Sequence, residues 1–337
     1  MKYNIILQIL LIAGCGHFKD VEETEAPDLL ADVQTRQTQR LEEGLKLVDA
    51  NGWLVPRDGD AIHWSGKFCA AFGPALNFDS TASEYPKEPG RFGRRAPPRC
   101  WTPELGNVCS DTSWSRDAFV IGLGPCALRT ANLSLLQRHE AYGRSNTWLM
   151  GKPLSDGRVL YSPQVIGMLY QMIYSLGGPD NANRHWPSVY PSGLDDFEAH
   201  LQVMSIVTRG EISRKQGDAD AIPRKPEGNL YRLRYKSSSG YQLQEFVEED
   251  GYMRLLSINE IMYERLREHA NREPNCPMYQ SAFAIYSGDY TKAIELCEMA
   301  SPPICSYVRC DEEKRCKLAD DAYACDLILR RLASPQN

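Results

Sequence analysis

The chain of 337 residues has no apolar run long enough to cross a bilayer. A spanning helix needs about 20 predominantly apolar residues, and the most apolar stretch, from Ile5 to Ile12, is shorter and is interrupted by Gln8. The sequence also lacks a basic stripe, since 38 Lys and Arg residues stand against 44 Asp and Glu residues, for a net charge of −6. These absences argue against a membrane-embedded protein and against a nucleic acid partner.

Several sequence signatures of catalysis are missing as well. No Gly-x-Ser-x-Gly segment is present, so a serine nucleophile of the α/β-hydrolase kind is unsupported. Gly122-x-Gly124 falls in a predicted helix without a preceding strand, so it is no dinucleotide fingerprint. No repeat of fixed period is visible. We therefore expect no cofactor.

The N-terminus has the parts of a bacterial export signal. Lys2 precedes the apolar run, which closes on Ile12-Ala13-Gly14-Cys15. This tetrapeptide resembles a lipobox, the cleavage and acylation signal of bacterial lipoproteins. The resemblance implies that residues 1–14 are a signal peptide, that Cys15 is lipidated, for instance with palmitate, and that acyl chains make the membrane contact. Because Gly16 and not Asp follows the cysteine, the implied location is the cell envelope at the outer membrane. The competing interpretation is a buried first helix with a chance cysteine.

Ten cysteines remain after Cys15, an even number that predicts disulfide bonds in an oxidising compartment. Four lie between residues 69 and 126 and six between residues 276 and 325, which suggests two local clusters; the pairing within each stays open. A zinc site at Cys305, Cys310 and Cys316 is the alternative. Their spacing lacks the C-x-x-C pairs of common zinc modules and no histidine is close, so we expect no metal.

The remaining sequence predicts an all-α fold. Residues 15–27 are acidic and poor in apolar side chains, typical of a lipid-anchored tether, and residues 28–337 form a single helical domain. Proline-rich residues 74–112 predict a long loop pinned by disulfides, and alternating residues 231–236 allow one short hairpin. Helices are expected at 28–50, 60–72, from about 115 to 127, 162–176, 194–207, 242–268, 276–286, 290–299 and 320–332.

Two polar clusters at predicted helix starts are candidates for glycan chemistry. The first contains Asp60 and His63, and the second contains Trp114, Arg116 and Asp117. Glycoside cleavage uses paired carboxylates with aromatic rings that stack on sugars. We therefore expect Asp60 and Asp117 as catalytic carboxylates. The expected substrate-binding residues are His63, Trp101, Trp114 and Arg116.

Trp114-Ser115-Arg116-Asp117 resembles the Trp-x-Arg-Asp segment of the glucoamylase family. The resemblance implies an (α/α)-toroid or partial toroid with its active site on loops at one end, where Arg116 and Asp117 contact sugar. The chain departs from that family at Phe246-Val247-Glu248-Glu249, a loose echo of its Trp-Glu-Glu stretch, and has fewer predicted helices than a full toroid.

Each candidate residue also has a structural explanation. Asp60 is a good N-cap, Asp117 can stabilise a helix dipole from the first turn, and a histidine at a helix start is more often solvated or hydrogen-bonded than catalytic. Asp196 and His200 are four residues apart and could share a metal ion, but no further ligands occur at the spacing of a known metal site. Two functions follow as hypotheses: a lipid-anchored envelope protein that hydrolyses or binds a glycan, or a non-catalytic lipoprotein that acts as a binding or envelope-assembly module.

Overall fold

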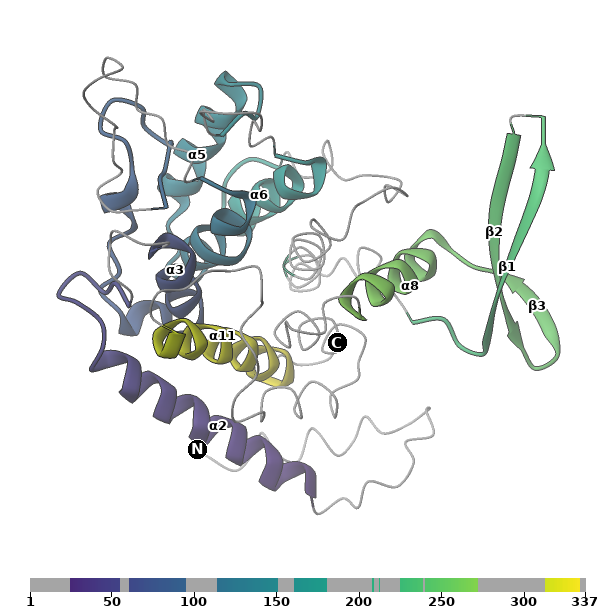
Figure 1. Ribbon diagram of the computed structural model, residues 1–337, viewed down its shortest axis with the longest axis horizontal. Coiled ribbons are helices and arrows are strands. Elements are labelled where there is room, and N and C mark those ends of the chain that lie inside the picture. Colours follow the sequence, from purple (N-terminus) through teal and green to yellow (C-terminus); the bar gives the residue numbers. More distant parts are fainter. Residues whose placement is uncertain are drawn as a thin grey trace.

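The computed structural model describes residues 25–54, 61–94, 114–150, 161–180, 225–238, 240–271 and 313–333, together with Thr208 and Ile212. Figure 1 shows a helical body and, beyond α8, an antiparallel sheet that stands clear of it. The helices are α2 (Glu25–Leu45), α3 (Ala61–Phe72), α4 (Gly124–Arg129), α5 (Leu133–Ser145), α6 (Pro163–Ser175), α8 (Ile258–Asn271) and α11 (Glu313–Ala333). Short turns η1 (Gly73–Ala75) and η2 (Ser80–Ser83) and the π-helix η3 (Ala118–Leu123) complete the helical elements.

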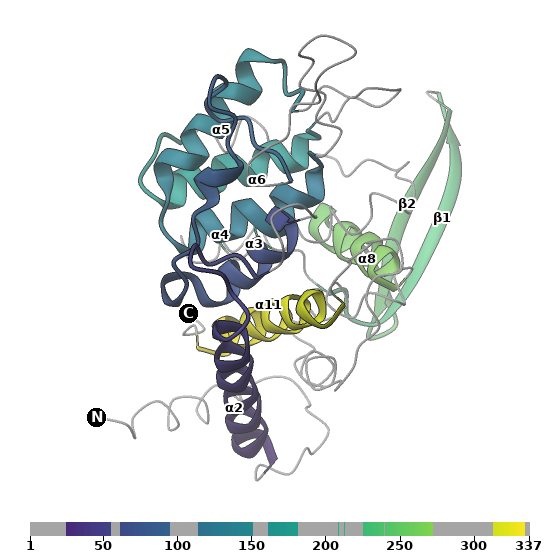
Figure 2. The same ribbon diagram turned by 60° about the vertical axis from the view of Figure 1, so that its left-hand side comes forward.

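Helix α3 lies at the centre of the body. It packs against α11 on one side and against η3 and α4 on the other, as Figure 2 shows. All residues from Ala61 to Ala71 are buried, including the polar ones. The sequence predicted one apolar face on this helix, and the structure confirms that Trp64 belongs to the core. A helix enclosed on all sides no longer needs a polar face, which explains why the periodicity showed only part of the burial.

Two glycines allow the backbones of α3 and η3 to approach closely. A Cβ atom on Gly66 would lie 2.6 Å from the carbonyl carbon of Gly122, and a Cβ on Gly122 would lie 2.7 Å from the carbonyl oxygen of Ile62. The disulfide between Cys69 and Cys126 links α3 to α4, the helix that directly follows η3. The predicted N-terminal cysteine cluster therefore contains a disulfide, and it fastens α3 to α4.

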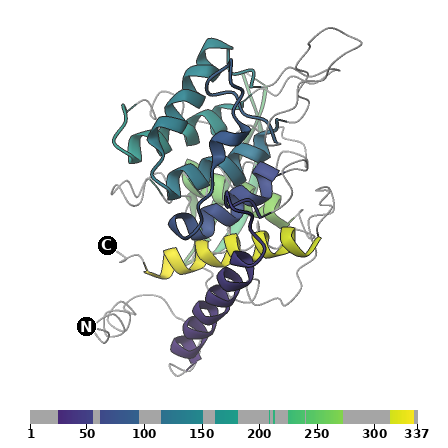
Figure 3. The ribbon, with the colours of Figure 1, turned by 90° about the vertical axis from the view of Figure 1, so that its left-hand side faces the viewer.

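The outer helices pack on this centre. α2 crosses α11, and Gln37 donates a 2.8 Å hydrogen bond from Nε2 to the carbonyl of Ala322 (Figure 3). On the opposite side, α5 and α6 pack against each other and against α4. α6 confirms the prediction for residues 162–176, with Pro163 in its first turn and Gly177 at a φ of 87° just past its end. None of the described helices has the length and apolarity to cross a membrane.

The expectation of an all-α, toroid-like domain is wrong, because the chain contains a three-stranded antiparallel sheet. Its strands are β1 (Asn229–Ser237), β2 (Gly240–Glu249) and β3 (Tyr252–Leu255), and β2 lies in the middle. Residues 231–236, which were expected to allow a short hairpin, all lie in the single strand β1, and the hairpin forms between β1 and β2. The predicted helix at 242–268 is wrong over residues 242–255 and correct only for the part that forms α8.

The error at 242–255 has a clear physical cause. Leu243, Phe246 and Val247 fit the three- and four-residue spacing of a helix, but Leu243 and Val247 also lie on one face of a strand. The deciding signal was Asp250-Gly251, whose φ angles of 52° and 81° form the two-residue hairpin turn between β2 and β3. Asp-Gly between alternating residues is a strong hairpin signal, and it outweighs helical spacing in so short a segment.

Other boundaries also differ from expectation. α2 begins at Glu25, inside the predicted tether, and α11 begins at Glu313 rather than near residue 320. α5 was not predicted, because His139 and Glu140 interrupt its apolar stripe although both are buried. The predicted helices at 194–207, 276–286 and 290–299 lie outside the described residues, as do the signal peptide and most of the predicted tether.

Candidate functional site

A buried hydrogen-bonded chain connects Trp114, Tyr161 and His139 between η3, α5 and α6. Trp114 Nε1 donates to the hydroxyl of Tyr161 at 3.1 Å, and that hydroxyl donates to Nε2 of His139 at 2.8 Å. Nδ1 of His139 lies 2.7 Å from the carbonyl oxygen of Gly90, which can only accept, so the proton of the neutral imidazole is on Nδ1. The side chains of Phe92 and Phe119 pack against the imidazole. The indole N–H of Trp114, the hydroxyl of Tyr161 and both ring nitrogens of His139 therefore all have a partner within the protein.

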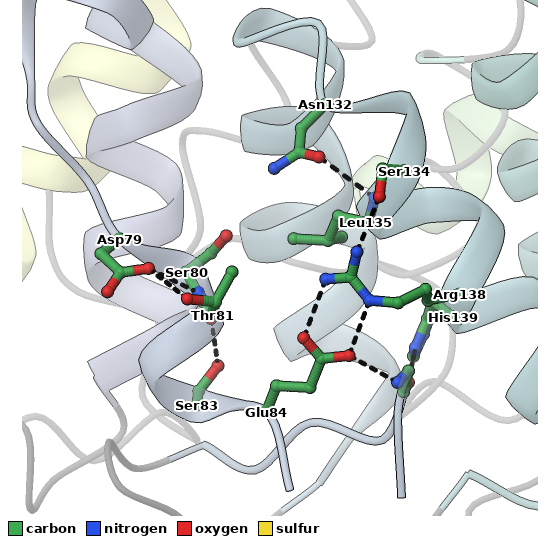
Figure 4. Close-up of polar contacts among 11 residues, drawn as sticks. Asp79, Ser80, Thr81, Ser83, Glu84, Asn132, Ser134, Leu135, Arg138 and His139 are labelled. Atoms are coloured by element: carbon green, nitrogen blue, oxygen red, sulfur yellow. Dashed lines mark hydrogen bonds and ion pairs between the residues drawn. The ribbon is translucent and has the colours of Figure 1, made fainter. Parts of the chain in front are cut away.

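The backbone N–H and the carbonyl of Gly90 are both hydrogen-bonded, to Glu84 and to His139. Figure 4 shows Glu84 together with its other partner, Arg138. Glu84 Oε1 accepts from the N–H of Gly90 at 2.6 Å, and the same carboxylate accepts two hydrogen bonds from Arg138. Gly90 has a φ of 86°, and a Cβ there would lie 2.0 Å from the carbonyl oxygen of Arg138. The described half of the proline-rich loop is thus fixed to α5 by polar contacts.

Burial sets the protonation state of this network. Desolvation lowers the pKa of His139 to about 4, against opposing contributions from the Gly90 carbonyl and the charge of Glu84. Burial alone would raise the pKa of Glu84, but hydrogen bonds from Arg138 and Gly90 outweigh it and lower that pKa. At neutral pH the imidazole is uncharged and the carboxylate is ionised. With no ring nitrogen open to solvent, His139 is suited to holding the loop and not to transferring protons to a substrate.

The structure buries two of the residues expected to bind a glycan. Trp114 is 2% exposed, and its indole lies within the aromatic cluster around His139. His63 is also 2% exposed, in α3, where its ring packs edge-on against Trp64. Arg116 and Asp117 are half-buried in the first turn before η3. Ser115 accepts a 3.2 Å hydrogen bond from the N–H of Ala118 and so caps this turn.

Three expected residues, Cys15, Asp60 and Trp101, lie outside the described residues. The separation of the two expected catalytic carboxylates, Asp60 and Asp117, is therefore not defined. Asp117 is the residue before η3, and its side chain makes no capping hydrogen bond there. Phe246-Val247-Glu248-Glu249, the segment compared with the glucoamylase glutamates, lies in strand β2, where Glu248 accepts a 2.8 Å hydrogen bond from the hydroxyl of Tyr231.

A buried ion pair, which sequence analysis missed, joins α3 to α11. Lys67 Nζ donates to Asp320 and lies 4.1 Å from the ring centroid of Trp64. Burial raises the pKa of Asp320 against the opposing charge of Lys67. Burial also raises the pKa of neighbouring Asp321 to about 7, although Arg40 lowers it. Lys67 is the one Lys, Arg, Asp or Glu residue in α3, and its partner lies 253 residues away in the sequence, so no local pattern reveals its role.

One shallow groove lies over the seam between α2 and the start of α11. Its lining is polar apart from one leucine, and comprises Gln39, Glu42, Glu43, Lys46, Leu47 and Lys314. A 2.8 Å ion pair between Lys314 and Glu43 crosses it. Of the residues expected to bind glycan, those that the structure describes do not line this groove. Among the described residues, no cluster of three or more His, Cys, Asp or Glu side chains could hold a metal ion.

The sheet carries the most conspicuous exposed surface of the described residues. Large apolar side chains are exposed on both of its faces, namely Tyr231, Leu233, Tyr241, Leu243, Tyr252, Met253 and Leu255. At the base of the sheet, Arg232 pairs with Glu245 and Glu268, and Arg254 pairs with Glu249 and Glu260. These pairs join the sheet to α8. They lower the pKa of Glu260 to about 2, chiefly through its hydrogen bonds with Arg254.

The hairpin end, defined as residues 233–238 and 240–243, differs from this base. Arg234 stacks at 4.6 Å over the ring of Tyr241, and Lys236 lies opposite Tyr241 in the strand register. Both cations are exposed, and neither has a carboxylate partner among the described residues. No Asp or Glu occurs between Leu230 and Gln244. The hairpin end is therefore basic as well as apolar, while the base of the sheet is neutralised by ion pairs.

Comparison with known proteins gives no family for this chain. No family model matches it, and no curated protein or solved structure is significantly similar to it. The function must therefore be argued from the residues described above. Besides Cys69 and Cys126, two cysteines of α11 are disulfide-bonded, Cys316 and Cys325.

Proposed function

We propose that this chain is a non-catalytic, lipid-anchored protein of the bacterial cell envelope. In this proposal Cys15 carries the acyl chains, the disulfide-stabilised helical body is a scaffold, and the sheet β1–β2–β3 is the binding element. The observation that carries the non-catalytic part is the burial of Trp114. An indole that is 2% exposed and hydrogen-bonded to Tyr161 has no face left to stack on a sugar.

The burial of His63 supports the same conclusion. His63 is enclosed in the central helix, so a substrate has no direct path to its ring. The groove on α2 is lined by none of the described residues of the two clusters and is crossed by an ion pair. A scaffold, by contrast, accounts for the buried side chains as packing and leaves the exposed apolar sheet to make contacts.

Export and anchoring are supported by two kinds of residue. The lipobox-like segment ending at Cys15 supplies the acylation position, and disulfide-bonded cysteines are typical of proteins outside the reducing cytosol. The anchoring experiment follows labelled palmitate in cells that make the wild type or Cys15→Ser. We expect label and membrane association in the wild type alone. Label in the Cys15→Ser protein, or a wild type without label, would contradict the proposed anchor.

Glycan hydrolysis or binding remains the second candidate, because Arg116 and Asp117 stay partly exposed next to the buried Trp114. The discriminating assay measures cleavage of a panel of bacterial oligosaccharides by the wild type, Asp60→Asn and Asp117→Asn. The scaffold proposal expects no cleavage by any of the three proteins. Cleavage by the wild type that either substitution abolishes would establish the glycosidase and remove the scaffold proposal.

A further inference from the structure

We propose that the hairpin end, residues 233–238 and 240–243, inserts into the surface of an anionic lipid bilayer. The proposal deepens the proposed function, because it names the partner of the sheet. Its first support is the distribution of apolar side chains. Leu233 is opposite Gln244 on one face of the hairpin, whereas Leu243 is opposite Arg234 on the other face. They are 55% and 53% exposed.

This distribution distinguishes insertion from docking on a flat surface. A protein or a stacked base would cover one face of the sheet and leave the other leucine in water. A lipid interface surrounds the end of the hairpin and removes both leucines from water together. The tyrosines fit the same environment, since Tyr235 and Tyr241 combine an apolar ring with a hydroxyl that stays hydrated at the headgroup level. Figure 1 shows that the end of β1 and the start of β2 lie at a free end of the sheet, away from the helical body.

Charge supplies the second support. Arg234 and Lys236 have no carboxylate partner among the described residues, and the segment between Leu230 and Gln244 contains no acid. The protein as a whole is acidic, with a net charge of −6, so an anionic surface would repel it except at such an end. Anionic headgroups therefore attract the hairpin end and repel the rest of the protein, which orients the protein on the membrane.

The test is flotation of the full chain with vesicles of phosphatidylglycerol and phosphatidylcholine in equal amounts, or of phosphatidylcholine alone. All proteins carry Ile9→Lys and Cys15→Ser, so that neither the N-terminal apolar run nor an acyl chain contributes. We expect flotation with the anionic vesicles, weakened by added salt. The combination of Arg234→Ala and Lys236→Ala should reduce the partition coefficient about 30-fold. Lys87→Ala with Lys225→Ala removes the same charge elsewhere and should change it less than about twofold.

A second pair of variants tests insertion itself. Leu233→Thr with Leu243→Thr should reduce partitioning about tenfold, because threonine keeps the strand preference but loses apolar area. Met253→Thr with Leu255→Thr is the matched control, since these side chains are 55% and 54% exposed near the other end of the sheet. Equal losses in both pairs would overturn the proposal. The proposal would also be overturned if none of the substitutions in the hairpin end changed the binding to vesicles.

Failure of flotation with either vesicle would also overturn the membrane proposal and would leave the hairpin end to an acidic protein partner. Such a failure is distinguishable from failure of the proposed function. The palmitate and oligosaccharide experiments concern Cys15, Asp60 and Asp117, whereas flotation concerns only the sheet.

Discussion

Lys67 of α3 and Asp320 of α11 form an ion pair in the interior of the helical body. Lys67→Met would remove the cation and leave the carboxylate buried without its counter-charge. We expect a loss of about 3–5 kcal/mol in the free energy of unfolding at pH 7, measured by chemical denaturation. The loss should shrink as the pH falls, because the pKa of Asp320 is already raised by burial and protonation removes the uncompensated charge.

The double variant Lys67→Met with Asp320→Asn separates charge from packing. Both members of the pair are then neutral, so most of the lost stability should return. If the double variant is as unstable as Lys67→Met alone, the effect belongs to packing around α3, and the interpretation of the pair as a charge contact is wrong.

His139 should make stability depend on pH in a known direction. Its pKa is about 4 in the folded protein and about 6.5 in an unfolded chain, so the unfolded state binds more protons between these values. Its contribution to stability is present above pH 6.5 and is lost as the pH falls to about 4, a change of about 3 kcal/mol. In His139→Asn this component of the pH dependence should disappear when unfolding is followed across that window.

Asp321 provides the opposite sign as a control. Its pKa is raised to about 7, so the folded state binds more protons than the unfolded state between about pH 4 and pH 7. Its contribution therefore becomes less favourable as the pH rises. Asp321→Asn should steepen the gain in stability from pH 4 to pH 6.5, whereas His139→Asn should flatten or reverse it. Identical profiles for the two variants would contradict both assignments.

The disulfide between Cys69 and Cys126 should stabilise the body mainly by restricting the unfolded chain. The two cysteines are 57 residues apart, and closing a loop of this length contributes about 4 kcal/mol in the chain-entropy model. Replacing both by alanine should lower the free energy of unfolding by about this amount in oxidising urea titrations. An unchanged midpoint would mean that the loop is already restrained without the bond.

The β2–β3 turn depends on Gly251, which has a φ of 81°. Gly251→Ala should destabilise the turn by about 1 kcal/mol, because a Cβ disfavours the left-handed conformation even where no atom is close. Gly251→Asn should cost less, since asparagine tolerates that conformation. Faster amide hydrogen exchange in β3 is the measurement. Equal protection in both variants and the wild type would show that ion pairs to α8 hold β3 without the turn.

The helices that sequence analysis predicted correctly are those whose ends and faces are encoded locally. Pro163 and Gly177 mark the ends of α6, Ser115 caps the turn before η3, and apolar spacing identifies α3. Helix α5 was missed because buried polar residues interrupt its apolar pattern. His139 interrupts the stripe of α5, and its partners Gly90 and Tyr161 are far away in the sequence.

The candidate site was predicted less well than the helices. Trp114 resembles a sugar-binding residue by its neighbours Arg116 and Asp117, but its burial depends on packing against Phe92 and His139, which no local pattern reports. The sheet was partly visible in the alternation of residues 231–236. Its exposed leucines could not be assigned to two opposite faces until the register with β2 was known.

The order β1–β2–β3 leaves one side of β1 without a neighbouring strand within the sheet. Arg234 and Lys236 lie two residues apart on one face of this outer strand, so antiparallel pairing of two such strands from separate molecules can set cation against cation. The same side chains that favour an acidic surface thus discourage growth of the sheet into fibrils.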